Sequence, residues 1–307
     1  MIRESIKKMK YTISIFLVII LSGCSGTKRV VETQKPKEQT EIIVKTKDSI
    51  IQEKLITIIN DSVIVNKDKT VKREEEIEKG NDFNQIVTKR FITTHQLWDE
   101  LLSKHISDKG NVNYKSFKNE HKKLLDYINV LNLTFSSDDF RTFSKEDKLA
   151  YWINAYNAMT IDLILRNYPI KSIKDIDKPW DKRFWKLGEK WYNLNDIEHQ
   201  ILRKMDEPRI HFAIVCASIS CPKLLNEAYN ALNLNEQLTN VTKEFLSDTS
   251  KNNISENKIE LSKIFQWFTK DFKQNGSLID FLNQYSNIKI SAKAKKSFKT
   301  YNWNLND

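Results

Sequence analysis

Large aromatic side chains are confined to one part of this 307-residue chain. All seven tryptophans lie between Trp98 and Trp303, whereas residues 25–90 contain no tryptophan or tyrosine and a single phenylalanine, Phe83. A segment without large apolar side chains cannot easily offset the entropy lost on ordering. We therefore predict one globular domain over residues 91–307, preceded by a flexible charged tether over residues 24–90.

The first 24 residues have the features of a secretory signal followed by a lipid-acceptor site. Residues 1–23 contain four basic residues near their start, then a largely apolar run over residues 13–21, then small residues before Cys24. This order is typical of a signal peptide, and the run is shorter than the about 20 apolar residues of a membrane-spanning helix. We predict a lipid on Cys24, with an uncleaved anchor or an ordinary signal peptide as alternatives.

A lipid on Cys24 predicts a membrane partner and a place in the cell envelope. The residue after Cys24 is Ser25 rather than an aspartate. In this respect the chain resembles lipoproteins of the outer membrane that face the periplasm. Residues 1–23 hold four basic residues and one acidic residue, so their removal lowers the formal charge from +10 to +7. Lysine and glutamate are interspersed, without a block of five like charges, which indicates a mixed solvated surface and no nucleic-acid partner.

Hydrophobic spacing after residue 90 alternates between helical and extended patterns without a regular βαβ order. We therefore predict an α+β fold, a single helix-rich domain around a small mixed sheet. The expected helices cover residues 94–105, 116–131, 145–167, 196–205, 262–272 and 277–285, with one or two more within 223–246. The expected strands cover residues 210–217, 258–261 and 297–304, with a short strand near residues 110–114 and a hairpin over 184–194.

The segment 145–167 predicts the most central helix of the domain, because apolar residues occur nearly all round it. Asn154 and Asn157 are the exceptions. A buried amide must find hydrogen-bond partners or cost about 1–3 kcal/mol. The two side chains are expected either to bind the backbone of neighbouring loops, which we favour, or to take part in an active site.

The sequence after the hairpin offers a second candidate group. Asn195 followed by Glu198 fits a capping box, in which Glu198 would bind the backbone at the start of a helix. A catalytic role for Glu198 is the alternative. His199 and Arg203, four residues apart, are expected to form a solvated pair.

Residues 210–222 combine a histidine, two cysteines and a proline. In a strand, His211 and Cys216 would point to opposite faces, so they are poorly placed to meet. Cys221 precedes Pro222 and an expected helix, whose dipole would lower the pKa of the thiol. We predict that Cys221 and His211 form a nucleophile–base pair; the alternative is a Cys216–Cys221 disulfide or two inert thiols.

Four separated motifs together resemble one protein family. They are Tyr151–Ala158, Asp196–Arg203, His211–Pro222 and Tyr301–Asn306. Their order is similar to that of the domain of unknown function 547 (DUF547) family, which includes many bacterial lipoproteins and has no established activity. Members of that family usually carry Asn-Cys-Gly where this chain has Val215-Cys216-Ala217, and an aspartate in place of Asn302.

Two functions remain open at this point. The first is an envelope thiol hydrolase or acyl transferase, with Cys221 as nucleophile, His211 as base, and Glu198 or Asn154 as the orienting group. The second is a non-catalytic envelope binding or scaffold module that carries the Cys216–Cys221 disulfide. Its partner would be an envelope protein or peptide. The histidines and cysteines show no zinc-ligand spacing, so we predict neither a metal nor a cofactor.

Overall fold

The computed structural model describes the backbone of residues 74–307 and the side chains from residue 84 onward. The expected signal peptide, Cys24 and most of the expected tether lie outside the described residues. Within the described part, no helix combines the length and apolar character needed to cross a membrane.

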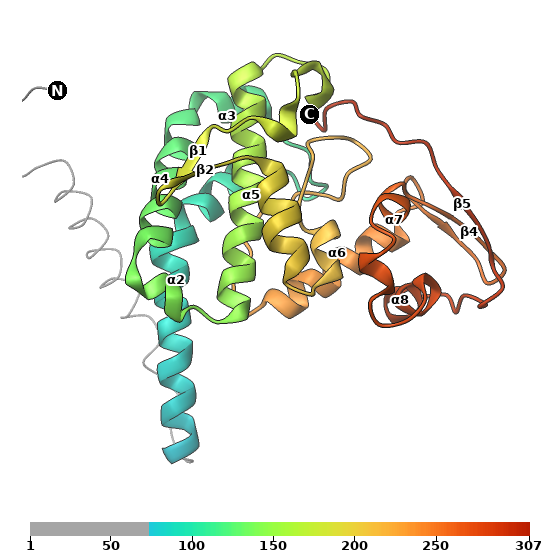
Figure 1. Ribbon diagram of the computed structural model, residues 1–307, viewed down its shortest axis with the longest axis horizontal. Coiled ribbons are helices and arrows are strands. Elements are labelled where there is room, and N and C mark those ends of the chain that lie inside the picture. The colour runs from blue at the N-terminus through green and yellow to red at the C-terminus, as the bar shows by residue number, and fades with distance from the viewer. Residues whose placement is uncertain (1–73) are drawn as a thin grey trace, which may run out of the picture. The chain divides into compact units, whose positions relative to one another are not determined.

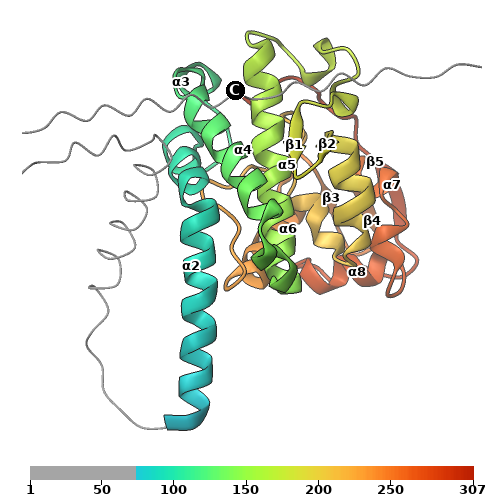
Figure 2. The ribbon, with the colours of Figure 1, turned by 60° about the vertical axis from the view of Figure 1, so that its left-hand side comes forward.

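Three long helices pack side by side, and the last of them, α5, is buried over most of its length (Figure 1). Ser144 caps the start of α5: its hydroxyl accepts from the Asp147 backbone N–H, while the Asp147 carboxylate accepts from the Ser144 backbone N–H. Figure 2 shows α2 extending past the ends of its neighbours. The helices of this layer are α2 (Glu74–His105), α3 (Tyr114–Asn119), α4 (His121–Ser136) and α5 (Lys145–Asn167).

Several helix boundaries differ from those predicted, and two of them show the physical reasons. α2 begins at Glu74 rather than at residue 94, so its first half runs through the segment assigned to the tether. That half is rich in charged helix-forming residues and has few large apolar ones, so hydrophobic spacing gave no signal there. The single helix expected over residues 116–131 is divided at Glu120, where α3 ends and α4 begins.

In the described part of the chain the strands form two small sheets, and the predicted α+β class is confirmed. The predicted hairpin is present, with Trp185 opposite Tyr192 in an antiparallel pair. In the other sheet the order is β3-β4-β5, antiparallel and then parallel. The strands are β1 (Trp185–Leu187), β2 (Lys190–Tyr192), β3 (Asn253–Ile254), β4 (Lys258–Leu261) and β5 (Lys295–Phe298). The remaining helices are α6 (Leu234–Ser247), α7 (Ile264–Trp267) and α8 (Leu278–Tyr285).

Two hydrophobic clusters stabilise the described domain. The larger one surrounds α5, and the smaller one lies among α6, α7, α8 and β4. Phe212 is fully buried in the smaller cluster, with its ring centroid 5.1 Å from that of Phe245. Ala213, Ile214 and Val215, which follow directly, belong to the larger cluster. The apolar segment after residue 209 therefore joins the two clusters.

The buried strand predicted over residues 210–217 is wrong. Pro208–Phe212 forms a 3-10 turn, and the chain beyond it is irregular. The backbone N–H groups of Ala213 and Ile214 both bind the Ile210 carbonyl, so these polar groups are satisfied without a neighbouring strand. The apolar composition of this segment correctly indicated that it is buried. Burial between two clusters does not require an extended backbone, so the prediction of a strand did not follow.

Candidate active site

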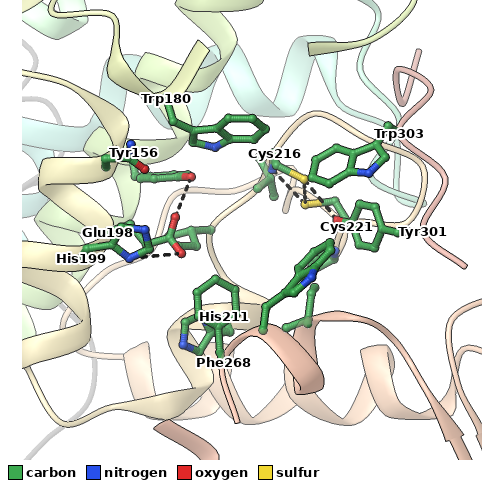
Figure 3. Close-up of a pocket in the computed structure, with 16 residues that line it drawn as sticks. Tyr156, Trp180, Glu198, His199, His211, Cys216, Cys221, Phe268, Tyr301 and Trp303 are labelled. Atoms are coloured by element: carbon green, nitrogen blue, oxygen red, sulfur yellow. Dashed lines mark hydrogen bonds and ion pairs between the residues drawn. The ribbon is translucent and has the colours of Figure 1, made fainter. Parts of the chain in front are cut away.

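A cavity of about 210 Å³ lies where α5, the turn after β2, α7 and the C-terminal segment meet (Figure 3). Glu198, Tyr156 and His199 occupy one side, which we call the acid side. The thiols of Cys216 and Cys221 lie on the opposite side, next to the Tyr301 ring; these three residues form the thiol side. The aromatic residues Trp180, Trp267, Phe268 and Trp303 complete most of the wall.

Glu198 is a buried carboxyl group on a turn of π-helix, Asp196–Ile201. Its Oε2 accepts a hydrogen bond of 3.2 Å from the hydroxyl of Tyr156, which projects from α5. Burial raises the pKa of Glu198 to about 7, although the Tyr156 hydrogen bond and the charge of Arg203 oppose the shift. A carboxyl group of this kind exchanges a proton near neutral pH, as a general acid or base must.

The predicted Asn195–Glu198 capping box is wrong. The side-chain oxygen of Asn193 accepts from the Asp196 backbone N–H at 2.7 Å and so caps the turn instead. Asn195 donates its amide to Asp181 at 2.6 Å. These contacts leave the Glu198 side chain out of the cap, and it lines the cavity instead.

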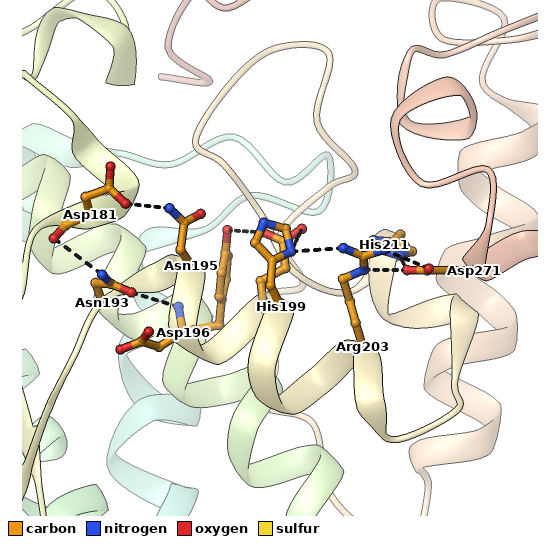
Figure 4. Close-up of polar contacts among 10 residues, drawn as sticks. Asp181, Asn193, Asn195, Asp196, His199, Arg203, His211 and Asp271 are labelled. Atoms are coloured by element: carbon orange, nitrogen blue, oxygen red, sulfur yellow. Dashed lines mark hydrogen bonds and ion pairs between the residues drawn. The ribbon is translucent and has the colours of Figure 1, made fainter.

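A chain of polar contacts continues from His199 to His211 (Figure 4). Arg203 donates to His199 Nδ1 at 3.2 Å and makes two hydrogen bonds, of 2.6 and 2.8 Å, to the carboxylate of Asp271. The same carboxylate accepts from His211 Nε2 at 2.8 Å. Burial would raise the pKa of Asp271, but the hydrogen bonds from Arg203 and His211 outweigh it and hold the group ionised. Burial lowers the pKa of His211, against the pull of Asp271.

On the thiol side, the Cys216 sulfur lies within hydrogen-bond distance of three polar side-chain groups. Its Sγ lies 3.0 Å from the Cys221 Sγ and 3.2 Å from each of the hydroxyls of Ser218 and Tyr301, while its backbone N–H donates to the Cys221 Sγ at 2.9 Å. Ser218 also donates to Tyr301 at 3.3 Å, which orients the phenol proton toward the sulfur. Donors directed at one sulfur stabilise its thiolate.

The pKa values of the two thiols are shifted in opposite directions. The hydrogen bond with Cys221 lowers the pKa of Cys216 in spite of burial, and the contacts with Ser218 and Tyr301 lower it further. Burial raises the pKa of Cys221, and its contact with Cys216 raises it further. Both cysteines are free, at an Sγ–Sγ separation of 3.0 Å rather than the about 2.05 Å of a disulfide bond. The chemically suitable nucleophile is therefore Cys216, the more exposed of the two.

Residues 140–246 match the model of a family described as "Protein of unknown function, DUF547". This match supports the resemblance to the DUF547 family that the four sequence motifs indicated. Curated proteins and solved structures gave no match to the chain. The DUF547 segment holds Tyr156, Glu198 and both thiols, whereas Tyr301 and Asp271 lie beyond it.

Two buried amides of α5 fix loops around the cavity, as favoured from the sequence. Asn157 donates to the Ala213 carbonyl at 2.9 Å and accepts from the Val215 N–H at 3.0 Å, directly before Cys216. Asn154 makes the equivalent pair of bonds to the carbonyl and N–H of Tyr229, at 2.8 and 3.0 Å. Asn154 does not line the cavity, so the structure gives it no orienting role toward a catalytic group.

Ala217 stands where the DUF547 pattern usually has glycine, and the backbone conformation at this residue shows what the difference costs. Its φ is +55°, in the left-handed region that glycine enters without steric cost. The glycine common in DUF547 members fits this backbone, whereas alanine adopts it with a penalty of about 1 kcal/mol. The turn after Cys216 is therefore kept by its surroundings, which include the bond from the Ile219 N–H to the Asn304 carbonyl.

The predicted Cys221–His211 pair is not formed. No hydrogen bond joins the two residues; His211 Nε2 binds Asp271, and its ring stacks on Phe268 with a centroid distance of 3.9 Å. No α-helix begins at Cys221 either, because α6 starts only at Leu234, so the expected helix dipole is absent. The structure does place three of the four predicted groups, Glu198, His211 and Cys221, around one cavity.

Three site residues were missed from the sequence. Tyr156 and Tyr301 both lie in motifs of the DUF547 resemblance, and that position was the available signal. Asp271 lies outside those motifs, and nothing in its local pattern marks it. Among the residues that the structure describes, no group of histidine, cysteine or carboxylate side chains is arranged to hold a metal ion.

Proposed function

We propose that this cavity is the active site of a thiol-dependent hydrolase or acyl transferase. Cys216 is the nucleophile, and Glu198 transfers protons from the opposite side. The observation that carries the proposal is the convergence of Cys221, Ser218 and Tyr301 on the Cys216 sulfur in a cavity that also holds a buried carboxyl group. His211, which is hydrogen-bonded to Asp271, then has a structural role beside the acid side.

The reaction proceeds through a thioester. The Cys216 thiolate attacks the acyl carbon, the bond to the leaving group breaks, and protonated Glu198 gives its proton to that group. In hydrolysis, water adds to the thioester carbon and passes one proton to the Glu198 carboxylate. The C–S bond then breaks, its electron pair returns to sulfur, and the carboxylic acid leaves.

The test is acylation of the full chain carrying Cys24→Ser, so that Cys216 and Cys221 are the remaining thiols. With p-nitrophenyl acetate under reducing conditions, we expect a burst of p-nitrophenol and one acetyl group on Cys216, located by peptide mass spectrometry. Cys216→Ala abolishes the burst. Cys221→Ser keeps a hydroxyl donor and still permits acylation of Cys216.

Two outcomes would overturn the proposal. Acetylation of Cys221 alone would return the nucleophile to the position expected from the sequence. If both thiols of unreduced protein resist iodoacetamide until reductant is added, they form a disulfide, and the cavity belongs to a non-catalytic envelope binding module.

We further propose that the protein is a lipoprotein of the cell envelope, anchored through Cys24 to the outer membrane and facing the periplasm. The support is the order of residues 1–24, which lie outside the described structure. Metabolic labelling with a fatty-acid analogue should modify the wild-type chain and spare Cys24→Ser. Labelling of both, or of neither, would contradict the anchor.

A further inference from the structure

The charges that line the cavity contrast with the charge of the chain. The sequence contains 50 lysine and arginine residues and has a formal net charge of +10. Among the described residues, however, no lysine or arginine lines the cavity, and Glu198 is its sole carboxylate. A phosphate or carboxylate ligand would find no cation here, so the lining disfavours anionic substrates.

One oxygen of Glu198 has no donor within the described part of the chain. Oε2 is bound by Tyr156, whereas Oε1 lies 4.0 Å from His199 Nδ1, beyond hydrogen-bond range. An arginine can only donate, so the bond from Arg203 makes His199 Nδ1 an acceptor with no proton for Glu198. The Glu198 side chain is only 9% exposed and lines the cavity, so this oxygen is an acceptor without a protein donor at the cavity wall.

Aromatic rings line much of the same cavity. Trp267 stacks on Trp303 with centroids 5.8 Å apart, and Tyr301 lies 4.6 Å from Trp303. Trp180 meets Trp303 edge-on at 5.9 Å. Trp303 already contacts an ammonium group of the protein, because Lys174 Nζ lies 4.0 Å from its ring centroid. Aromatic faces beside a carboxylate attract organic cations.

We propose that the cavity binds the primary ammonium group of an amine, and that this amine is the acyl acceptor. The assignment rests on the proposed thioester chemistry and names its second substrate. The ammonium group binds Glu198 Oε1, while the aromatic wall covers the alkyl chain. The enzyme is then an acyl transferase that forms amides.

The transfer step balances with the groups present. The substrate R–NH₃⁺ gives one proton to the Glu198 carboxylate, and the neutral amine attacks the thioester carbon on Cys216. The C–N bond forms and the C–S bond breaks, with its electron pair returning to sulfur. The second amine proton goes to that sulfur, so the products are an amide, the Cys216 thiol and protonated Glu198.

Binding is measured in the full chain carrying Cys24→Ser and Cys216→Ala, which cannot form a thioester. Nα-acetyl-lysine methylamide is titrated while tryptophan fluorescence is followed. We expect saturable binding that strengthens at least tenfold between pH 6 and pH 8, and at least tenfold weaker binding of the neutral Nε-acetylated probe. Glu198→Gln removes this preference and retains the hydrogen bond from Tyr156. n-Butylamine separates a small free amine from a peptide lysine as the source of the ammonium group.

Trp191 and Trp267 provide a matched pair of variants, since both are about half exposed and Trp191 lies on β2, outside the cavity. We expect Trp267→Ala to weaken binding of the cationic probe, Trp267→Phe to restore part of it, and Trp191→Ala to leave it unchanged. Equal binding of the charged and neutral probes, or no binding of either, overturns the amine assignment. In that case, a p-nitrophenol burst from p-nitrophenyl acetate in the Cys24→Ser chain, which retains Cys216, would still support the thiol chemistry.

Discussion

The two sides of the cavity are built in different ways. The acid side uses helical backbone, with Tyr156 on α5 and Glu198 on the turn that packs against it. The thiol side uses irregular backbone, held by the side chain of Asn157 and by hydrogen bonds to the C-terminal segment. Helical backbone satisfies its own polar groups, whereas the thiol loop depends on distant residues. The chemistry of Cys216 is therefore more sensitive to remote substitutions than that of Glu198.

The largest effect is expected from removing the amide that fixes the thiol loop. Asn157→Ala leaves the buried Ala213 carbonyl and Val215 N–H without partners and should lower the free energy of unfolding by about 4 kcal/mol. Denaturant unfolding measures this loss. Asn154→Ala is the matched control, since it should cost a similar amount and leave the alkylation rate of Cys216 unchanged. Equal alkylation rates in both variants would show that the loop does not depend on Asn157.

The acid side should be tested through its pH dependence. The pKa of Glu198 is raised from 4.5 to about 7, so the folded state keeps a proton that the unfolded state loses. Its stabilising contribution is full below pH 4.5 and is lost as the pH rises to 7, by about 3 kcal/mol in all. Glu198→Gln should remove this part of the pH dependence of the unfolding free energy. Parallel curves for the two proteins would place Glu198 in a solvated environment.

A smaller effect is expected from weakening the hydrogen bonds to the nucleophile. Tyr301→Phe removes one donor to Cys216 and should slow alkylation by iodoacetamide at pH 7 roughly tenfold, moving the pH profile upward. Tyr285→Phe, outside the cavity, is the control and should leave the rate as it is. An unshifted profile in Tyr301→Phe would mean that the Tyr301 hydroxyl does not stabilise the thiolate.

The smallest effect concerns the backbone next to Cys216. Ala217→Gly relieves the left-handed conformation at φ +55° but adds freedom to the unfolded chain, so we expect a gain of up to about 1 kcal/mol in stability. Thermal unfolding measures the change. A loss of stability would show that the Ala217 methyl group makes packing contacts worth more than the relieved strain.

Local patterns predicted the elements that carry their own signal. The buried helix α5, the hairpin at Trp185 and Tyr192, and the pinning role of Asn154 and Asn157 follow from periodicity and from the cost of a buried amide. The apolar segment after residue 209 misled the prediction, because burial between two clusters and burial in a sheet have the same composition.

The sequence by itself determined where the aromatic core lies, that the fold is α+β, and which motifs supply the acid and the thiols. Only the tertiary structure decided that the hydroxyls of Ser218 and Tyr301 meet the sulfur of Cys216 rather than that of Cys221, and that Asp271 binds His211 across 60 residues of chain. The reason is physical. The acidity of a thiol or carboxyl group depends on burial and on donors within about 4 Å, and those neighbours come from segments far apart in the sequence.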